Sequence, residues 1–121
     1  MVLGIGVDVV SVARVERALG RHPGLRERIF QPEELGTADA KGEVRSLAAR
    51  FAAKEALRKA LGGSRGGALR DAVVLGGRGA PPRLDLRGGW RKAASDVGAT
   101  SLHLSISHER EYAVAMVVIE R

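Results

Sequence analysis

The pattern of apolar and polar positions predicts a chain of short strands and helices. Alternation with a period of two predicts strands over residues 2–10, 72–75, 83–86, 101–107 and 112–119. Helical spacing predicts helices over residues 12–19, 43–61 and 90–97, with single turns of helix over 25–30 and 31–35. Because strands and helices do not alternate regularly, we expect an α+β fold, in which a small antiparallel sheet packs with one long helix and several short ones.

The first predicted strand has two different faces. Its odd positions are apolar, whereas Gly4, Gly6 and Asp8 share the opposite face. Two glycines on one face would let a ligand or another backbone approach closely. Asp is a poor strand former, so Asp8 indicates either a turn or helix-cap carboxylate beside Ser11 or a group that binds a ligand.

A second carboxylate interrupts the apolar stripe of the 43–61 helix. At about 100° per residue, Leu47, Phe51 and Ala52 all lie within about 80° of Glu55. A buried carboxylate without a partner costs several kcal/mol, so Glu55 needs a cation or hydrogen-bond donors. One interpretation is an ion pair with Lys59, four residues further along the helix, at the edge of its buried face. The other is a bound cation.

Asp8 and Glu55 together favour a hard, oxygen-binding cation such as Mg²⁺, which keeps several water molecules and binds substrate phosphates. Arg50, Lys54 and Lys59 would then help to hold phosphate groups.

His108 is a third unusual residue, because it ends a predicted strand with the same parity as that strand's apolar positions. A histidine in such a place is more often structural than functional, and both interpretations stay open.

Composition narrows the class of protein. The 121 residues carry 20 basic and 14 acidic side chains, and this net charge of +6 favours nucleic acid, an anionic membrane, a phosphorylated metabolite or an acidic protein as partner. Two Phe, one Trp and one Tyr provide little surface for stacking the bases of single-stranded nucleic acid. The chain has no cysteine, which excludes disulfides and thiolate metal sites, and no apolar run approaches the roughly 20 residues of a membrane span. We expect one cytoplasmic domain over residues 1–121, small enough for oligomerisation to help complete its core.

Three motifs contain the unusual residues and point to one family. Gly4-Ile-Gly6-Val7-Asp8, Arg50-Phe51-Ala52-Ala53-Lys54-Glu55-Ala56 with Lys59 following, and Ser105-Ile106-Ser107-His108 closely resemble holo-[acyl-carrier-protein] synthases, the small stand-alone 4′-phosphopantetheinyl transferases. The resemblance runs nearly from end to end. It implies transfer of the 4′-phosphopantetheine arm of coenzyme A to a serine of an apo acyl carrier protein, with release of adenosine 3′,5′-bisphosphate, for fatty-acid or polyketide synthesis.

The resemblance also implies roles for individual residues. Asp8 and Glu55 match the Mg²⁺ ligands, and Lys59 matches a lysine near the reacting phosphate, so these three form the expected catalytic set. The expected coenzyme A contacts are Arg50, Lys54, Lys59 and His108. An acidic carrier protein would dock on the basic side chains of Arg14, Arg17, Arg21, Arg26 and Arg28. The resemblance also implies a homotrimer with active sites between subunits. It implies neither nucleic acid nor a membrane as a partner.

Two rival functions remain, a small basic module that binds nucleic acid and a non-catalytic subunit that holds a carrier protein without modifying it. The sequence departs from the family pattern at two positions, of which the first concerns affinity for the partner. Gly24 stands where a basic residue is expected in the docking segment, and Ser107 replaces the more usual Thr while keeping the hydroxyl.

Overall fold

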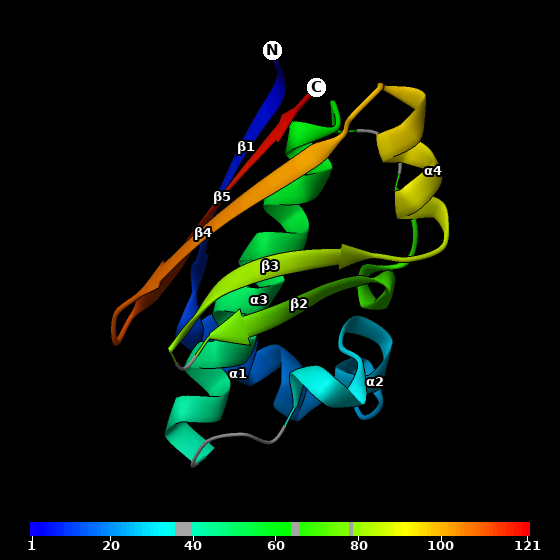
Figure 1. Cartoon of the computed structure of the whole chain (residues 1–121). Helices are drawn as coiled ribbons and strands as arrows, with labels where there is room; N and C mark the ends of the chain where they lie inside the picture. Colours follow the sequence, from blue (N-terminus) through cyan, green and yellow to red (C-terminus); the bar gives the residue numbers. More distant parts are fainter. Residues whose placement is uncertain (36–39, 64–65, 78) are drawn as a thin grey trace.

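The computed structural model describes residues 1–35, 40–63, 66–77 and 79–121. Eleven elements follow one another along these ranges (Figure 1): β1 Val2–Ser11, α1 Val12–Arg21, α2 Leu25–Ile29, η1 Pro32–Glu34, α3 Ala40–Ala60, η2 Leu69–Asp71, β2 Ala72–Gly77, β3 Ala80–Leu86, α4 Gly89–Asp96, β4 Ser101–His108 and β5 Tyr112–Glu120. Within the described ranges, no helix combines the length and apolarity needed to cross a bilayer.

Two antiparallel sheets sandwich the long helix. β5 lies in the centre of the three-stranded sheet with β1 and β4 beside it, and β2 and β3 form a separate hairpin. Helix α3 runs between this sheet and the hairpin, while α1 and α2 lie together at one end of the molecule and α4 at the other (Figure 1). This architecture confirms the expected α+β fold with one long helix.

The two ends of the chain meet on the far side of the molecule from α1 and α2. The amino group of Met1 donates a hydrogen bond to the carbonyl oxygen of Arg121 at 2.8 Å, and the amide of Arg121 donates to the carbonyl of Met1 at 2.9 Å. Residues 1 and 121 therefore continue the β1–β5 pairing to its last position.

Most predicted boundaries are correct to within three residues, and the differences have local causes. Helix α1 passes through Gly20, the predicted stop, and ends instead at Arg21 before the left-handed Gly24, whose φ is 85°. The hairpin strands are longer than predicted because β3 begins at Ala80 and includes Pro81 and Pro82. Prolines are tolerated there since β3 pairs with β2 alone and its other edge needs no donors.

The glycines of β1 face the long helix, so it is a backbone rather than a ligand that approaches them. A Cβ atom at Gly4 would lie 2.0 Å from the carbonyl oxygen of Ala60, and one at Gly6 would lie 1.8 Å from that of Ala56. Ile5, Val7 and Val9 consequently face outward, with 59% of Ile5 exposed, whereas Leu3, at the β1 irregularity, packs against the core. The strand thus exchanges an apolar buried face for close contact with α3, and this contact places Asp8 beside the helix.

We expect Gly6→Ala to lower the free energy of unfolding by about 1–3 kcal/mol, because the new methyl group overlaps a backbone carbonyl that cannot rotate away. Urea denaturation of the purified protein measures this change. Gly20→Ala is the matched control, since nothing lies within 4 Å of its Cβ position, and alanine in this helix should add about 0.5–1 kcal/mol. Equal stabilities for the two variants would contradict the close approach.

Candidate active site

A cavity of about 440 Å³ opens between β1, α1, α2 and α3. Its wall is mainly apolar and comes from α1, α2 and Phe51, whereas Asp8, Glu55 and Arg14 contribute charge. The same small space therefore holds both of the carboxylates that the sequence singled out, one from a strand and one from the long helix.

Asp8 reaches the cavity from the face of β1 that carries the two glycines. Its Oδ1 atom accepts a hydrogen bond from Nζ of Lys59 at 3.0 Å, and the same ammonium donates to the backbone carbonyl of Val7 at 3.0 Å. The other oxygen, Oδ2, is buried without a hydrogen-bond partner among the described residues. A buried carboxylate oxygen without a donor carries a desolvation cost that a bound cation would remove.

Glu55 pairs with a different cation from the one expected. Nη1 of Arg58 lies 3.3 Å from both carboxylate oxygens of Glu55, whereas Lys59 is engaged with Asp8. Of the two interpretations of Glu55, the ion pair with Lys59 is therefore wrong, and the bound cation stays a prediction. Glu55 is also only half-buried, because α3 is enclosed on its other sides by the sheet and the hairpin and turns this side toward the cavity.

The two carboxylates suit a hard cation that takes only some of its ligands from protein. No group of three or more His, Cys, Asp or Glu side chains with metal-binding spacing occurs in the part of the chain that the structure describes. Mg²⁺ commonly binds through one or two carboxylates together with water and substrate phosphate. The unpartnered Oδ2 of Asp8 and the half-buried carboxylate of Glu55 fit that ligand set.

Lys54 does not lie where a coenzyme contact would require it. Its side chain is fully buried, and Nζ donates to Oε1 of Glu34 at 3.0 Å and to the carbonyl oxygens of Leu69 and Ala72 at 3.1 and 2.7 Å. Burial lowers the pKa of Lys54, and the carboxylate of Glu34 opposes that shift. With its donors engaged inside the protein, Lys54 has none for a phosphate, and we withdraw the expected coenzyme A contact.

Arg50 and His108 lie outside the cavity lining. Nη1 of Arg50 donates to the hydroxyl of Ser46, while its Nε is buried with no partner within the described ranges. Burial lowers the pKa of the Arg50 guanidinium, and Glu34 counteracts this. His108 is exposed and lines a second hollow of about 550 Å³ with Arg45 and residues 109–111. Within one chain, the expected coenzyme A residues Arg50 and His108 therefore do not share a cavity with Asp8 and Glu55.

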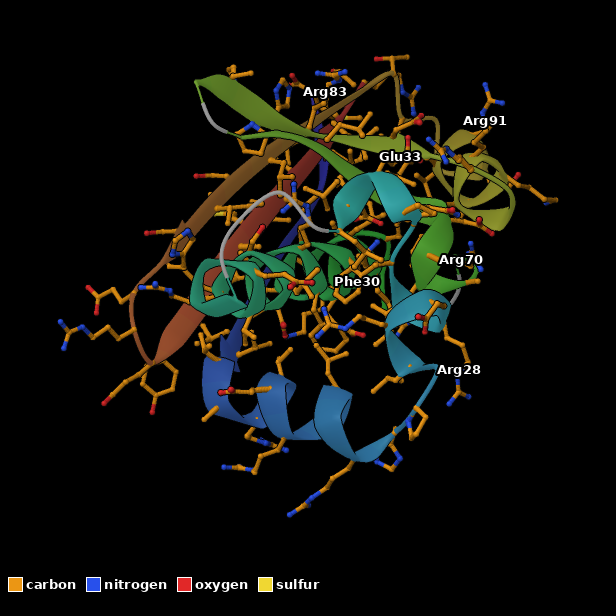
Figure 2. The ribbon with its side chains drawn as sticks, turned by 90° about the horizontal axis from the view of Figure 1, so that it is seen from below. Arg28, Phe30, Glu33, Arg70, Arg83 and Arg91 are labelled. Atoms are coloured by element: carbon orange, nitrogen blue, oxygen red, sulfur yellow. The ribbon has the colours of Figure 1, made fainter. Side chains whose placement is uncertain are left out.

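The expected docking arginines belong to the two short helices beside the cavity. Arg14, Arg17 and Arg21 are exposed along α1, and Arg14 also lines the cavity. On α2, Arg28 points away from the protein (Figure 2), whereas the guanidinium of Arg26 forms an ion pair with Glu43. Four of the five arginines thus present their charge to solvent around the cavity, and Arg26 is partly neutralised.

Sequence patterns predicted a turn of helix over residues 25–30 but not that its apolar side chains close the cavity from the side of α2. Leu25, Ile29 and Phe30 form this wall, and Phe30 is only 1% exposed. Glu34, which follows them, is buried and pairs with Lys54. The one signal available was a lysine on the helix face that also carries Leu47 and Leu57, since a cation among buried apolar residues requires a buried acid.

Comparison with known proteins identifies the family of the chain. A sequence model of the 4′-phosphopantetheinyl transferase superfamily matches residues 4–117. Holo-[acyl-carrier-protein] synthases of Beutenbergia cavernae and Leifsonia xyli are 50% and 46% identical over 121 residues, which is 100% of this chain and 100% and 98% of theirs.

Solved structures agree as well. The synthase of Neisseria meningitidis superposes with a TM-score of 0.88 at 34% identity over 100% of both chains. That of Helicobacter pylori, in complex with coenzyme A, gives 0.79 at 32% identity and covers 96% of this chain and 99% of its own. The chain belongs to the holo-[acyl-carrier-protein] synthases of the 4′-phosphopantetheinyl transferase superfamily.

Proposed function

We propose that the cavity holding Asp8 and Glu55 is the site at which the chain transfers the 4′-phosphopantetheine arm of coenzyme A to a serine of apo acyl carrier protein. The observation that carries the assignment is the buried, unpartnered Oδ2 of Asp8 in the same cavity as Glu55 and 3.0 Å, through Oδ1, from the ammonium of Lys59. Two carboxylates in one cavity, one of them bonded to the ammonium of Lys59, suit a pyrophosphate held by Mg²⁺. Residues 1–121 act in this proposal as a single transferase domain.

In this reaction the serine hydroxyl oxygen bonds to the phosphorus on the pantetheine side of the pyrophosphate, and the bond from that phosphorus to the bridging oxygen breaks to release adenosine 3′,5′-bisphosphate. The hydroxyl proton passes to solvent water. Asp8 and Glu55 would hold Mg²⁺, which supplies charge neutralisation to the pyrophosphate oxygens when bound. Lys59 is oriented by Asp8 and by the carbonyl of Val7. Its ammonium thereby faces the negative charge that grows on the leaving phosphate.

Two rival functions lead to different results in one assay. A binding module or a non-catalytic subunit would leave the carrier unmodified in the presence of coenzyme A and Mg²⁺. A location in the cytoplasm, and use of the modified carrier protein in fatty-acid or polyketide synthesis, stay predictions from the sequence.

We expect Glu55→Gln to lose about 100-fold or more in kcat/KM, because a catalytic cation supplies several kcal/mol of charge stabilisation and this variant removes one of its charged ligands. Mass spectrometry of the carrier after incubation with coenzyme A and Mg²⁺ measures the pantetheinyl adduct. Titration with Mn²⁺, followed by its electron paramagnetic resonance signal, should show weaker binding to the variant. Asp96→Asn, an exposed acid paired with Lys92 on α4, is the control. Wild-type turnover and Mn²⁺ binding in Glu55→Gln would remove Glu55 from the site.

The basic surface of α1 and α2 supports an acidic carrier protein as the partner. Attraction between opposite charges speeds the encounter of two proteins and fixes their orientation. This attraction weakens as salt screens the charges. Arg17 is exposed on α1 without lining the cavity, so a change there alters docking without altering the reacting groups.

We expect Arg17→Glu to raise the KM for carrier protein by about tenfold, as reversal of a docking charge does, and to leave the KM for coenzyme A unchanged. Steady-state kinetics at several salt concentrations measure both constants, and the difference from wild type should shrink at high salt. Arg91→Glu, on α4 and on the opposite side of the molecule in Figure 2, makes the same charge change away from the cavity. Equal effects of the two variants would contradict docking on α1.

A homotrimer with active sites between subunits is supported by the outer face of the three-stranded sheet. Ile5, Val7 and Val9 of β1 lie outward at 59%, 46% and 59% exposure, and Met116 of β5, the partner of Val7, is 43% exposed. Contiguous apolar surface of this kind marks an interface.

We expect Met116→Arg to convert the assembly to monomers, because a charge placed at the centre of an apolar interface loses its water without gaining a partner. Light scattering coupled to size-exclusion chromatography measures the mass. Val97→Arg, an equally exposed apolar residue at the end of α4, is the control and should leave the mass unchanged. A wild-type protein that is already monomeric would remove the trimer from the proposal.

A further inference from the structure

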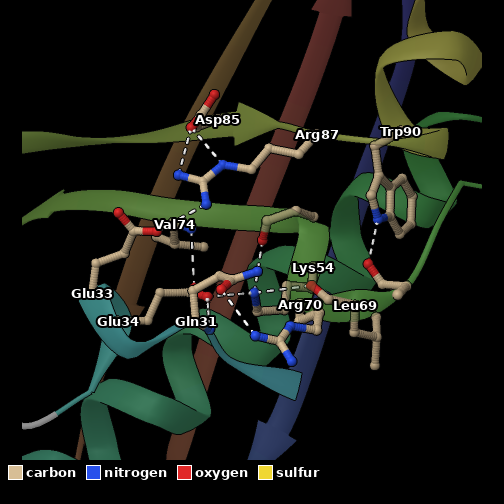
Figure 3. A network of polar contacts seen from close by, with 12 residues as sticks. Gln31, Glu33, Glu34, Lys54, Leu69, Arg70, Val74, Asp85, Arg87 and Trp90 are labelled. Carbon is tan, nitrogen blue, oxygen red and sulfur yellow. Dashed lines mark hydrogen bonds and ion pairs between the residues drawn. The ribbon is translucent and has the colours of Figure 1, made fainter. Parts of the chain in front are cut away.

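An ion pair inside the protein has no part in the transfer described so far. Lys54 and Glu34 are 0% and 2% exposed. The three protons of the ammonium match three acceptors, Oε1 of Glu34 and the carbonyl oxygens of Leu69 and Ala72. Both carboxylate oxygens of Glu34 are also used, since Oε1 accepts from the amide of Gln31 at 3.0 Å and Oε2 from that of Val74 at 3.0 Å. Figure 3 shows this network.

These contacts tie several segments together at one point. Lys54 belongs to α3, Glu34 ends η1, and their backbone partners lie in η2 and at the start of β2. Two outer contacts reinforce the same junction: Arg70 donates to the side chain of Gln31 at 3.1 Å, and Arg87 forms an ion pair with Glu33 at 2.9 Å. The turn at residues 31–34 is therefore fastened to the hairpin side of the protein as well as to α3.

The junction lies directly behind one wall of the cavity. Nζ of Lys54 is 5.4 Å from the centre of the Phe30 ring, and Phe30, Ile29 and Leu25 line the cavity. Neither Lys54 nor Glu34 is among the lining residues. Through Lys54 the pair thus lies against Phe30, a residue of the wall that faces the cavity.

Adjacent positions on α3 connect the pair to the site. Lys54 and Glu55 are neighbours, and successive side chains on a helix diverge by about 100°. One residue therefore fastens the α2 wall from behind while the next presents its carboxylate to the cavity. Helix α2 has only five residues and no side-chain cap, so its own hydrogen bonds are too few to keep it in place.

A buried ion pair suits a positioning role better than a stabilising one. An apolar pair of similar volume is often as stable, whereas directional bonds to a fixed charge allow one arrangement of the attached segments. Here those bonds use the three protons of the ammonium and both oxygens of the carboxylate, and they join α3, η1, η2 and β2.

We propose that Lys54 and Glu34 are positioning residues of the transfer site: their ion pair holds the wall formed by Leu25, Ile29 and Phe30, together with the docking face of α2, at a set place relative to Glu55. The proposal rests on the proposed function, because it assigns the pair to carrier docking. Loss of the pair acts on the carrier side of the cavity and leaves coenzyme A recognition intact.

Lys54→Met tests this in two ways. The KM for purified apo acyl carrier protein should rise by about tenfold or more, since small displacements of a positioned wall have effects of this size or larger, while the KM for coenzyme A stays within about twofold. Independently of activity, amide hydrogen exchange followed by mass spectrometry should become faster in residues 25–30, and it should stay unchanged in α1.

Two further variants keep the test decisive. Lys54→Met/Glu34→Gln leaves no buried charge, so it replaces the single variant if that variant does not fold, with the same expected results. Trp90→Phe removes the buried indole donor of α4, which bonds the carbonyl of Ala68 at 2.7 Å. This change lowers stability without altering a residue that lines the cavity. It should leave the carrier KM unchanged.

Several results would overturn the proposal: an unchanged carrier KM, equal rises in both KM values, unchanged exchange in residues 25–30, or the same carrier KM in Trp90→Phe as in Lys54→Met. A wild-type protein that transfers nothing would instead refute the proposed function, and the exchange measurement would still decide whether the pair holds α2.

Discussion

The close contact between β1 and α3 is the constraint on which the site depends. Because Gly4 and Gly6 have no side chains, the strand lies against the carbonyl groups of Ala60 and Ala56. The next residue on the same face, Asp8, reaches Lys59, which directly precedes Ala60 in the helix. A larger residue at either glycine would separate the elements that carry the two carboxylates. The packing of small residues and the placement of charge are thus one feature of the fold.

Helix α3 serves three surroundings at once, and its sequence reflects this. Alanines face the strand and the sheet, Lys54 faces the η1–β2 junction, and Glu55 and Phe51 face the cavity. Such a helix has no single apolar side, since it is buried around most of its circumference. Each face is adapted to one neighbour, which explains why charged residues occur in the middle of an otherwise alanine-rich segment.

The elements and the pair of carboxylates could be predicted from the sequence because their signals are local. Alternation in residues 2–10 and 112–119 and the composition of residues 43–61 depend on neighbours in the chain. The partners of charged groups could not be predicted, because they are set by contacts across the fold. Glu55 meets Arg58 rather than Lys59, since Lys59 is drawn to Asp8 on another element. Likewise Lys54 finds Glu34, which lies 20 positions away in the chain. The motifs therefore pointed to Asp8 and Glu55, which the fold brings into one cavity, whereas tertiary packing turns Lys54 inward.

The pairing of residue 1 with residue 121 has a practical meaning for how the protein can be extended. Both ends leave the molecule side by side, at the pole opposite α1 and α2 (Figure 1). A polypeptide fused to either end would emerge away from the arginine-bearing helices and leave the cavity entrance open. The same proximity lets a short linker join the two termini. The protein can therefore be circularly permuted, with new termini in another loop and the same order of strands in the sheet.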